Sequence, residues 1–109
     1  MRQEEELRQI VQKTRSTMGN SLIGIRIIVK KMKVSKSSIY SKIHKGLFSV
    51  PLHFGGLSRW PEYENELILA AVIAGWSEDD VRLLVKILQE ERENIFLLTA
   101  TDFVEDSVA

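Results

Sequence analysis

The stretch that decides the fold is "KVSKSSIYSKIHKG", residues 33–46. It contains four lysines, four serines and no acidic residue, and its two isoleucines are four positions apart. Isoleucines at this spacing lie on one side of a helix and can hold it against a core. Ser35 is a suitable N-cap, because its hydroxyl can accept a backbone N–H of the first turn, and Gly46 is a suitable terminator. We therefore predict a short helix over residues 36–45, with basic and hydroxyl side chains outside.

The charges of the chain are strongly segregated, although its formal net charge is zero. Residues 7–61 contain eleven bases and no Asp or Glu, whereas residues 62–109 contain twelve acids and three bases. Residues 1–6 contain one base and three acids. A basic segment of this kind favours a nucleic-acid or membrane surface as its partner. The alternative is that the two parts neutralise each other in the fold or in a dimer.

The composition is typical of one globular domain, with 109 residues of which 44% are apolar and 28% charged. The chain has no cysteine, which excludes disulfides, thiolate metal ligands and cysteine nucleophiles. The start, with three consecutive glutamates, does not resemble a signal peptide. The longest apolar run, residues 67–76, is about half a membrane span. We expect a cytoplasmic protein that does not enter a membrane.

The chain divides into four predicted segments. Residues 1–20 carry apolar side chains at every third or fourth position, which predicts an amphipathic helix. Residues 22–60 are predicted to form a helix-turn-helix and a wing, and residues 61–98 a pair of C-terminal helices. Residues 99–109 are predicted to be a short, frayed acidic tail.

A further short helix is predicted over residues 25–32, before the basic helix. Its run "IGIRIIV" is rich in β-branched residues and is also compatible with a strand. Two short helices separated by three or four residues form a helix-turn-helix.

Residues 47–60 are predicted to form two short extended segments around Gly55 and Gly56, which supply positive φ for a hairpin. Pro51 restricts the first segment to the edge of a sheet. Pro61 is expected in the first turn of the next helix. The predicted fold class is therefore mainly α: a winged helix-turn-helix with a small two-stranded β-hairpin wing and flanking N- and C-terminal helices.

The last two predicted helices follow the hairpin. Gly75 ends the first of them, and Ser77 is the predicted N-cap of the second. The acidic runs at residues 62–66 and 78–80 are predicted to be solvated helix starts and not a catalytic carboxylate pair.

A helix-turn-helix typically places its second helix in the major groove of DNA. Lysines then contact phosphates and guanine acceptors, and short hydroxyl side chains allow close approach. The residues expected nearest the bases are Lys36, Ser37, Ser41 and Lys42, and those expected on phosphates are Lys30, Lys33, Lys45 and Arg59. Ser38 and Tyr40 on the helix, and His53 and Ser58 on the wing, complete the candidate interface. Tyr40 could stack on a base or pack in the core.

The region "VKKMKVSKSSIYSKIHKGLFSVPLHFGGLSRW" carries a recognisable motif. Its members are Val34, Ser35, Lys36, Ser37, Ser38, Ile39 and Tyr40, then Lys45 and Gly46, Phe48, Pro51, Gly55 and Gly56, and Arg59 and Trp60. This pattern resembles the AlpA-like prophage regulators, small winged-helix proteins of the MerR-like and excisionase group. The resemblance covers roughly residues 25–92.

The resemblance implies a sequence-specific regulator that binds double-stranded DNA and is encoded by a prophage or integrative element. Such a protein acts as a transcription factor or as a recombination directionality factor. The chain departs from the family pattern at two places: Lys33 stands where a glycine is usual, and two extra residues separate Phe48 from Pro51. The N-terminal helix lies outside the resemblance.

The sequence contains no credible catalytic set, so we expect no enzyme, no cofactor and no small-molecule substrate. His44 and His53 are nine residues apart, with no cysteine to join them, and do not predict a metal site. A second hypothesis is a protein-interaction module whose basic half docks on an acidic protein partner. A homo-oligomer, formed through the terminal helices or head-to-tail on DNA, is also open.

Overall fold

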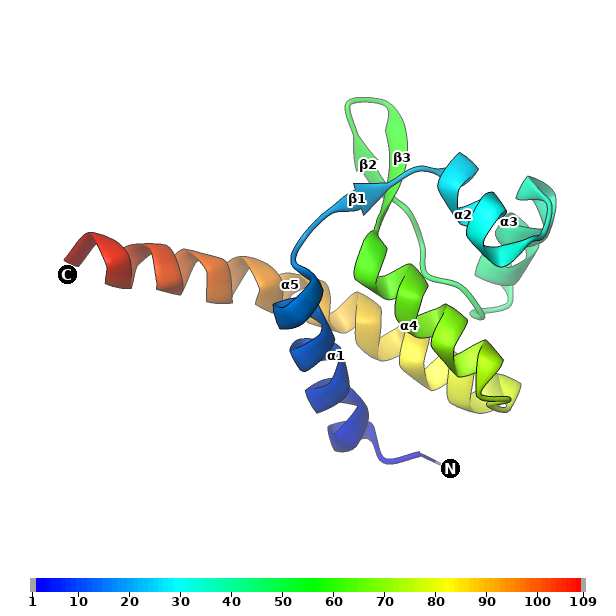
Figure 1. The fold of residues 1–109 in the computed structure, drawn as a ribbon, viewed down its shortest axis with the longest axis horizontal. Helices are drawn as coiled ribbons and strands as arrows, with labels where there is room; N and C mark the ends of the chain where they lie inside the picture. The colour runs from blue at the N-terminus through cyan, green and yellow to red at the C-terminus, as the bar shows by residue number, and fades with distance from the viewer. Residues whose placement is uncertain (1, 109) are drawn as a thin grey trace.

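The computed structural model describes the backbone of residues 2–108 and the side chains of residues 2–100. The chain is mainly helical, with a small three-stranded antiparallel sheet. Three helices form a helical body in which α1 (Glu4–Met18) packs on α5 (Glu78–Val108) and on α4 (Glu62–Ile73) (Figure 1). Leu7 and Val11 of α1 are buried in this contact, so the predicted amphipathic helix covers the core of its own chain.

The second part of the molecule contains the basic stretch of residues 33–46. Its elements are β1 (Leu22–Ile23), α2 (Ile25–Met32), α3 (Lys36–His44), β2 (Leu52–Phe54) and β3 (Leu57–Pro61). Residues 25–32 are a helix and not a strand, which decides between the two interpretations of their β-branched run. α2 and α3 contact each other and are joined by only three residues.

Local sequence signals explain the turn between α2 and α3. Ser35 caps α3, because its hydroxyl accepts the backbone N–H of Ser38 at 3.1 Å. Lys33 closes α2 in the left-handed conformation, with φ 57° and ψ 39°, and its N–H donates to the carbonyl of Val29. Among the described residues, Lys33 is the one non-glycine residue with positive φ. The chain therefore makes at Lys33 the turn that glycine makes more easily.

The sheet has one strand more than the predicted two-stranded hairpin. β2 and β3 form the hairpin around Gly55 and Gly56, whose φ angles are 57° and 83°. β1 adds on the other side of β3, so the strand order is β1-β3-β2 and β2 is an edge strand. The prediction missed β1 because two residues carry no periodicity of their own, and their conformation depends on pairing with β3.

The start of α4 also differs from the prediction. Pro61 was expected in the first helical turn, but it is extended and ends β3. The next backbone N–H, that of Glu62, donates to the carbonyl of Ser21 at 2.8 Å, and the Ser21 hydroxyl donates to the Glu62 carboxylate. The antiparallel pairing of β1 with β3 is therefore extended by one more pair of residues, Ser21 and Glu62, the latter being the first residue of α4.

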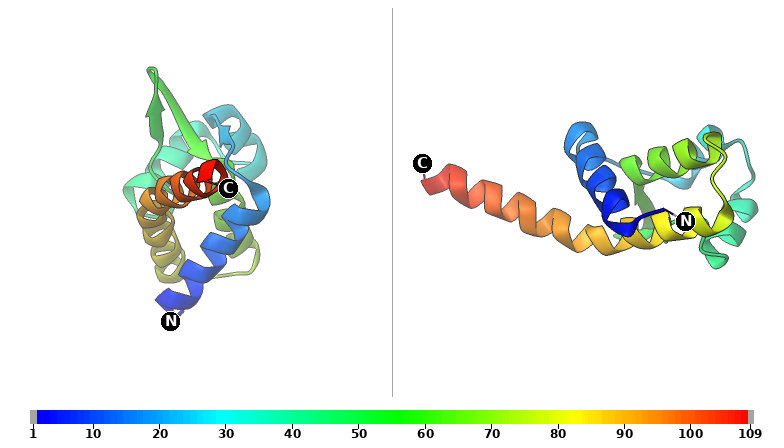
Figure 2. Two further views of the ribbon diagram at one scale, coloured as in Figure 1. Left: turned by 90° about the vertical axis from the view of Figure 1, so that its left-hand side faces the viewer. Right: turned by 90° about the horizontal axis from the view of Figure 1, so that it is seen from below.

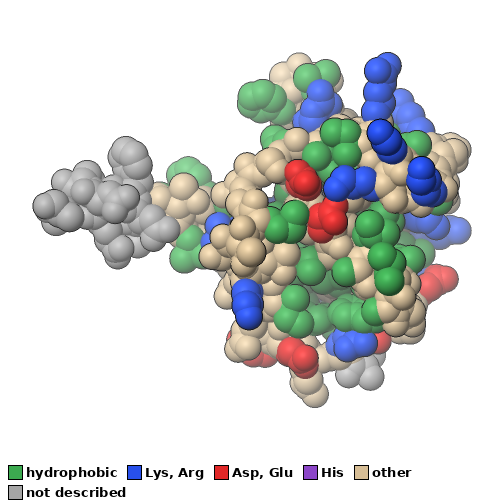
Figure 3. All heavy atoms as spheres, in the orientation of Figure 1, with side chains coloured by type: hydrophobic (Ala, Val, Ile, Leu, Met, Phe, Trp, Pro, Cys, Tyr) green, Lys and Arg blue, Asp and Glu red, His purple; other side chains and the backbone are tan. Residues whose placement is uncertain are grey.

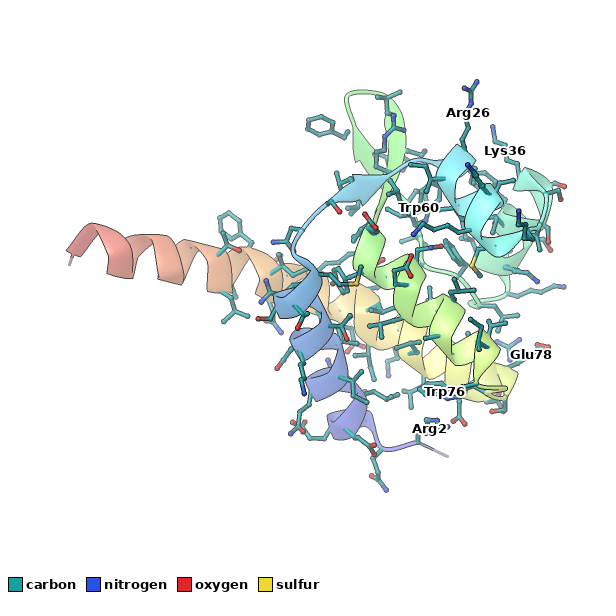
Figure 4. All side chains as sticks on the ribbon, in the orientation of Figure 1. Arg2, Arg26, Lys36, Trp60, Trp76 and Glu78 are labelled. Carbon is teal, nitrogen blue, oxygen red and sulfur yellow. The ribbon has the colours of Figure 1, made fainter. Side chains whose placement is uncertain are left out.

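Trp60 joins α3, the hairpin and the segment between them. It is fully buried, and its indole N–H donates to the carbonyl of Ser49 at 2.8 Å. The rings of Tyr40 and Phe48 each meet it edge-on with centroids 6.4 Å away. Figure 4 shows Trp60 between the hairpin and the α2–α3 pair. Because one side chain contacts all three segments, it fixes their mutual orientation.

α5 is much longer than the predicted last helix. Ser77 caps it as expected, accepting the Asp80 N–H at 3.2 Å. The helix then continues to Val108, so the backbone of residues 99–108 is helical and not a separate tail. Residues 78–109 contain neither glycine nor proline, and nothing in the sequence ends the helix earlier. Its last turns extend away from the rest of the molecule (Figures 1 and 2). No helix in the described part of the chain is both long and apolar enough to span a membrane.

Candidate nucleic-acid interface

Most bases of residues 7–61 have no acidic partner in the fold. Arg8 and Lys31 form ion pairs, but the other nine bases have no acidic group within 4.0 Å among the described side chains. These nine are Lys13, Arg15, Arg26, Lys30, Lys33, Lys36, Lys42, Lys45 and Arg59. Neutralisation of the basic part by the acidic part of the same chain therefore accounts for only two of eleven bases.

The two paired bases attach elements to one another. Arg8 of α1 donates to Glu90 and Glu91 of α5, and these hydrogen bonds raise the pKa of its guanidinium. Lys31 of α2 donates to Glu66 of α4 and lies 3.9 Å from Glu62, and the bond to Glu66 raises the pKa of the ammonium group. The second pair ties α2 to the helical body.

Three exposed bases lie along α2 and at its end. Arg26 and Lys30 are four residues apart, which places them on the same face of the helix, and Lys33, which follows the last helical residue, is also exposed. Arg26 and Lys36 both line a small concavity between α2 and α3. In Figure 4 these two side chains point to the same side of the molecule. Figure 3 shows basic side chains gathered over α2 and α3.

α3 presents a second set of polar residues on its outer face. An open concavity along this face is lined by Lys36, Ser37, Tyr40, Ser41, His44 and Lys45. Ile39 is fully buried on the opposite side, as the isoleucine spacing predicted. We call this outer face together with Arg26, Lys30, Lys33 and Arg59 the basic surface.

The structure does not bring Lys42 onto this face. Lys42 is half-buried and lines a different, largely apolar cleft of about 390 Å³, together with Trp76 and Glu78 from the helical body. With 100° of rotation per residue, Lys42 is about 120° around α3 from Lys36 and about 160° from His44. Ser38 is half-buried and does not line the outer concavity either. These two predicted contacts are therefore not part of the outer concavity.

The hydroxyl groups of the predicted face are not equivalent. The oxygens of Ser35 and Ser37 lie 3.2 Å apart and share a hydrogen bond, while Ser35 also caps the helix. Ser41 is exposed, and its hydroxyl has no hydrogen-bond partner among the described residues. Ser41 is therefore the hydroxyl most available to an external group.

Tyr40 has a packing role. Its ring is half-buried and meets Trp60 edge-on, while it also lines the outer concavity of α3. Packing against the core, one of the two roles predicted for Tyr40, is therefore observed. A stacking role toward a base stays a prediction.

The hairpin places its predicted residues on two faces. His53 and Ser58 are cross-strand neighbours, with His53 exposed and Ser58 half-buried. Arg59 is on the other face, where its guanidinium donates to the carbonyl of Ser58 at 2.8 Å. A Cβ atom at Gly24 would lie only 3.3 Å from this guanidinium, so Arg59 rests against the start of α2.

Three side chains of α5 form hydrogen bonds to the backbone at the end of α3 and at the entry to the hairpin, and so position the basic surface. The Arg82 guanidinium donates to the carbonyl of Lys45 at the end of α3, at 2.8 Å. Gln89 accepts the backbone N–H of Val50 at 3.0 Å, and Arg92 donates to the carbonyl of Val50 at 2.7 Å. Both the end of α3 and the entry to the hairpin are thus hydrogen-bonded to α5.

The acidic residues at the start of α4 are not all solvated, contrary to the prediction. Glu64 is fully buried and accepts two hydrogen bonds from Arg92, at 2.9 and 2.8 Å. Because Arg92 also holds Val50, this buried ion pair connects α4, α5 and the hairpin entry. It is a structural pair, since both carboxylate oxygens are occupied by one guanidinium.

The sequence interpretation missed five residues of this arrangement. Arg26 could have been found, because it is four residues before Lys30 on the same helical stripe. His44 could have been found from its position eight residues after Lys36. Nothing local to the sequence indicates Arg82, Gln89 or Arg92, because their partners are 37 to 42 residues away.

Among the described side chains, no group of three or more His, Asp or Glu residues could hold a metal ion. Comparisons with protein-family models, with curated proteins and with solved structures find no match for this chain.

Proposed function

We propose that this chain binds double-stranded DNA as a winged helix-turn-helix protein. In this proposal α2 and α3 are the helix-turn-helix, α3 lies in the major groove, and the β2–β3 hairpin is the wing. The observation that carries it is the basic surface, whose bases have no acidic partner in the described part of the chain. Unpaired bases on one surface are the electrostatic footprint of a nucleic-acid binder.

The side chains of α3 suit contact with a DNA groove. Lys36, Ser37 and Ser41 are on its outer face, where a long cation and short hydroxyls can reach base edges. Arg26 and Lys30 of α2, and Lys33 directly after it, are exposed beside α3 and suit phosphate contacts, which position a protein on the duplex. Protein interfaces are depleted in lysine and serine, so this composition favours DNA over an acidic protein partner.

The biological role that we propose follows the resemblance of residues 25–92 to AlpA-like regulators. The chain would control transcription of a prophage or integrative element, or direct its excision. The conformation of Lys33 supports this proposal, because Lys33 is left-handed at the position where the family usually has glycine.

The test is fluorescence anisotropy with labelled duplexes from the genetic neighbourhood of the protein, against a scrambled duplex, across a salt series. Each phosphate contact contributes roughly −0.9 to the slope of log K against log salt, so six contacts give a slope of about −5. A preference of about tenfold or more for one fragment is expected of a regulator. No binding to any duplex at low salt would overturn the proposal.

Two variants of α3 make this test residue-specific. Lys36→Ala is expected to lose about 1–3 kcal/mol of DNA binding, because Lys36 is on the outer face. Lys42→Ala removes the same charge from the same helix but from outside the outer concavity, and is expected to weaken binding much less. Equal losses in the two variants would exclude the outer face of α3 as the contact surface.

A further inference from the structure

Two large apolar side chains are exposed at the tip of the hairpin. Phe54 is 70% exposed and Leu57 is 51% exposed, and the two are cross-strand neighbours on either side of the turn. The hairpin protrudes from the rest of the molecule in both Figure 1 and Figure 2. Single exposed apolar residues are common on protein surfaces, but a pair at the end of a protruding hairpin is a feature that needs an explanation.

The tip is narrow because of its turn. Gly55 and Gly56 both have positive φ, which a type I′ two-residue hairpin turn requires. Neither position is crowded, since a Cβ atom there would meet nothing within 4 Å. Beyond Phe54 and Leu57 the hairpin therefore carries no side chain, because both turn residues are glycines.

The face of the hairpin that carries the apolar pair also carries a base. Cross-strand neighbours share a face, and so do residues two apart on a strand, which places Phe54, Leu57 and Arg59 together. The hairpin contains no acidic residue, and Arg59 rests against Gly24 at the start of α2. Figure 3 shows the hydrophobic side chains of the tip beside basic side chains. An apolar tip that continues a basic surface is complementary to DNA, whose bases are apolar on their faces and whose backbone is anionic.

We propose that Phe54, supported by Leu57, is a wedge that inserts between two base pairs from the minor groove and kinks the duplex. Apolar side chains used in this way partly unstack a base step and bend the DNA toward the major groove. Pyrimidine–purine steps unstack most easily and are the expected sites. This inference rests on the proposed DNA binding, and it adds that the protein bends DNA on its own.

The test uses the tightest-binding duplex of the salt series, of about three helical turns. It carries a fluorescent donor and acceptor at its two ends, and 2-aminopurine at one pyrimidine–purine step in each of several versions. We expect the wild-type protein to raise energy transfer between the ends. We also expect it to raise 2-aminopurine fluorescence at one step, because an unstacked 2-aminopurine is less quenched.

Three variants separate the wedge from general binding. Phe54→Ala with Leu57→Ala is expected to abolish both fluorescence changes and to weaken binding about tenfold, with the salt slope unchanged. Phe54→Leu keeps an apolar wedge and is expected to keep the bend. Ile73→Ala is the matched control, because Ile73 is 77% exposed on α4, outside the hairpin. Circular dichroism melting checks that each variant is folded, which is expected because the replaced side chains are exposed.

The outcomes distinguish this inference from the proposed function. If the wild-type protein binds the duplex with a steep salt slope but changes neither signal, the wedge is excluded and DNA binding stands. The same holds if the double variant bends the duplex as well as the wild type. If no duplex is bound, both proposals fail.

Discussion

Charged side chains are used in opposite ways in the two parts of this molecule. In the helical body, Arg8, Arg82, Lys86 and Arg92 each have a carboxylate oxygen within 4.0 Å. On the basic surface, no base has such a partner among the described side chains. The same residue types therefore hold helices together in one part and remain available to a ligand in the other.

The difference has an energetic consequence. Removing one partner of a buried charge pair in the body is costly, because the other charge is left without compensation in a low-dielectric interior. Unpaired like charges on one surface repel each other and lower stability, and a polyanion would relieve that repulsion. Removing a paired base of the body should thus lower the free energy of unfolding, whereas removing an unpaired base of the basic surface should instead weaken DNA binding.

The largest effect is expected for Arg92→Ala. This change leaves the fully buried Glu64 carboxylate without a partner and also removes the hydrogen bond to Val50. Breaking a buried ion pair on one side typically costs about 3–5 kcal/mol. Urea denaturation should therefore show a loss of that size in the free energy of unfolding.

The control for this prediction comes from the basic surface. Lys36→Ala also removes one base, but an exposed and unpaired one, and is expected to change stability by no more than about 0.5 kcal/mol. Adding Glu64→Gln to Arg92→Ala should recover part of the loss, because it removes the buried charge. If Arg92→Ala and Lys36→Ala were equally stable, the contrast between the two parts would be wrong.

A smaller effect of the opposite sign is expected for Lys33→Gly. A non-glycine residue in the left-handed conformation costs about 1–2 kcal/mol, and Lys33 has φ 57°. Glycine should therefore raise the free energy of unfolding by about 1 kcal/mol. The same change should weaken DNA binding and make the salt slope less steep by about 0.9, because one base is lost.

Lys30→Gly is the matched control for this prediction. It removes an exposed base three residues earlier, from inside α2, where glycine costs about 1 kcal/mol. The two variants should thus lose DNA affinity alike while their stabilities move in opposite directions. Destabilisation by both would mean that the side chain of Lys33 contributes more to the fold than its backbone conformation costs.

Local signals explain why much of the fold could be predicted from the sequence. The bounds of α3 follow from the Ser35 cap and from Gly46, whose φ is 75°. The hairpin follows from Gly55 and Gly56, whose conformations few other residues adopt. β1 could not be predicted, because its two residues become a strand only by pairing with residues almost forty positions later.

Residues of the candidate site could be predicted only where helical spacing determines which side chains share a face. Charge counting identified the basic segment, and spacing alone would have added Arg26 and separated Lys42 from Lys36. The burial of Glu64 could not be foreseen, because its partner Arg92 is 28 residues away and the local sequence is that of a solvated helix start. Long-range partners decide which charges pair, and a single sequence does not reveal them.

The smallest effect concerns pH and the buried carboxylate of Glu91 in the helical body. Burial alone would raise its pKa, but hydrogen bonds from Asn94, Gln12 and Arg8 outweigh burial and lower the pKa below its ordinary value of 4.5. On acidification the unfolded chain therefore takes up this proton before the folded one does. The contribution of Glu91 to stability is fully present above the ordinary pKa and is lost as the pH falls through the lowered one.

Urea denaturation between pH 7 and pH 3 measures this contribution. In Glu91→Gln the decline of stability below about pH 5 should be shallower than in the wild type, because the titrating group is gone. Glu93→Gln removes an exposed carboxylate from the same helix and should leave the wild-type decline unchanged. The difference in pH dependence between the wild type and Glu91→Gln should be modest, because burial and hydrogen bonding shift the pKa of Glu91 in opposite directions. Parallel pH profiles for the wild type and Glu91→Gln would show that this carboxylate, although paired in the helical body, contributes no more to stability than an unpaired group.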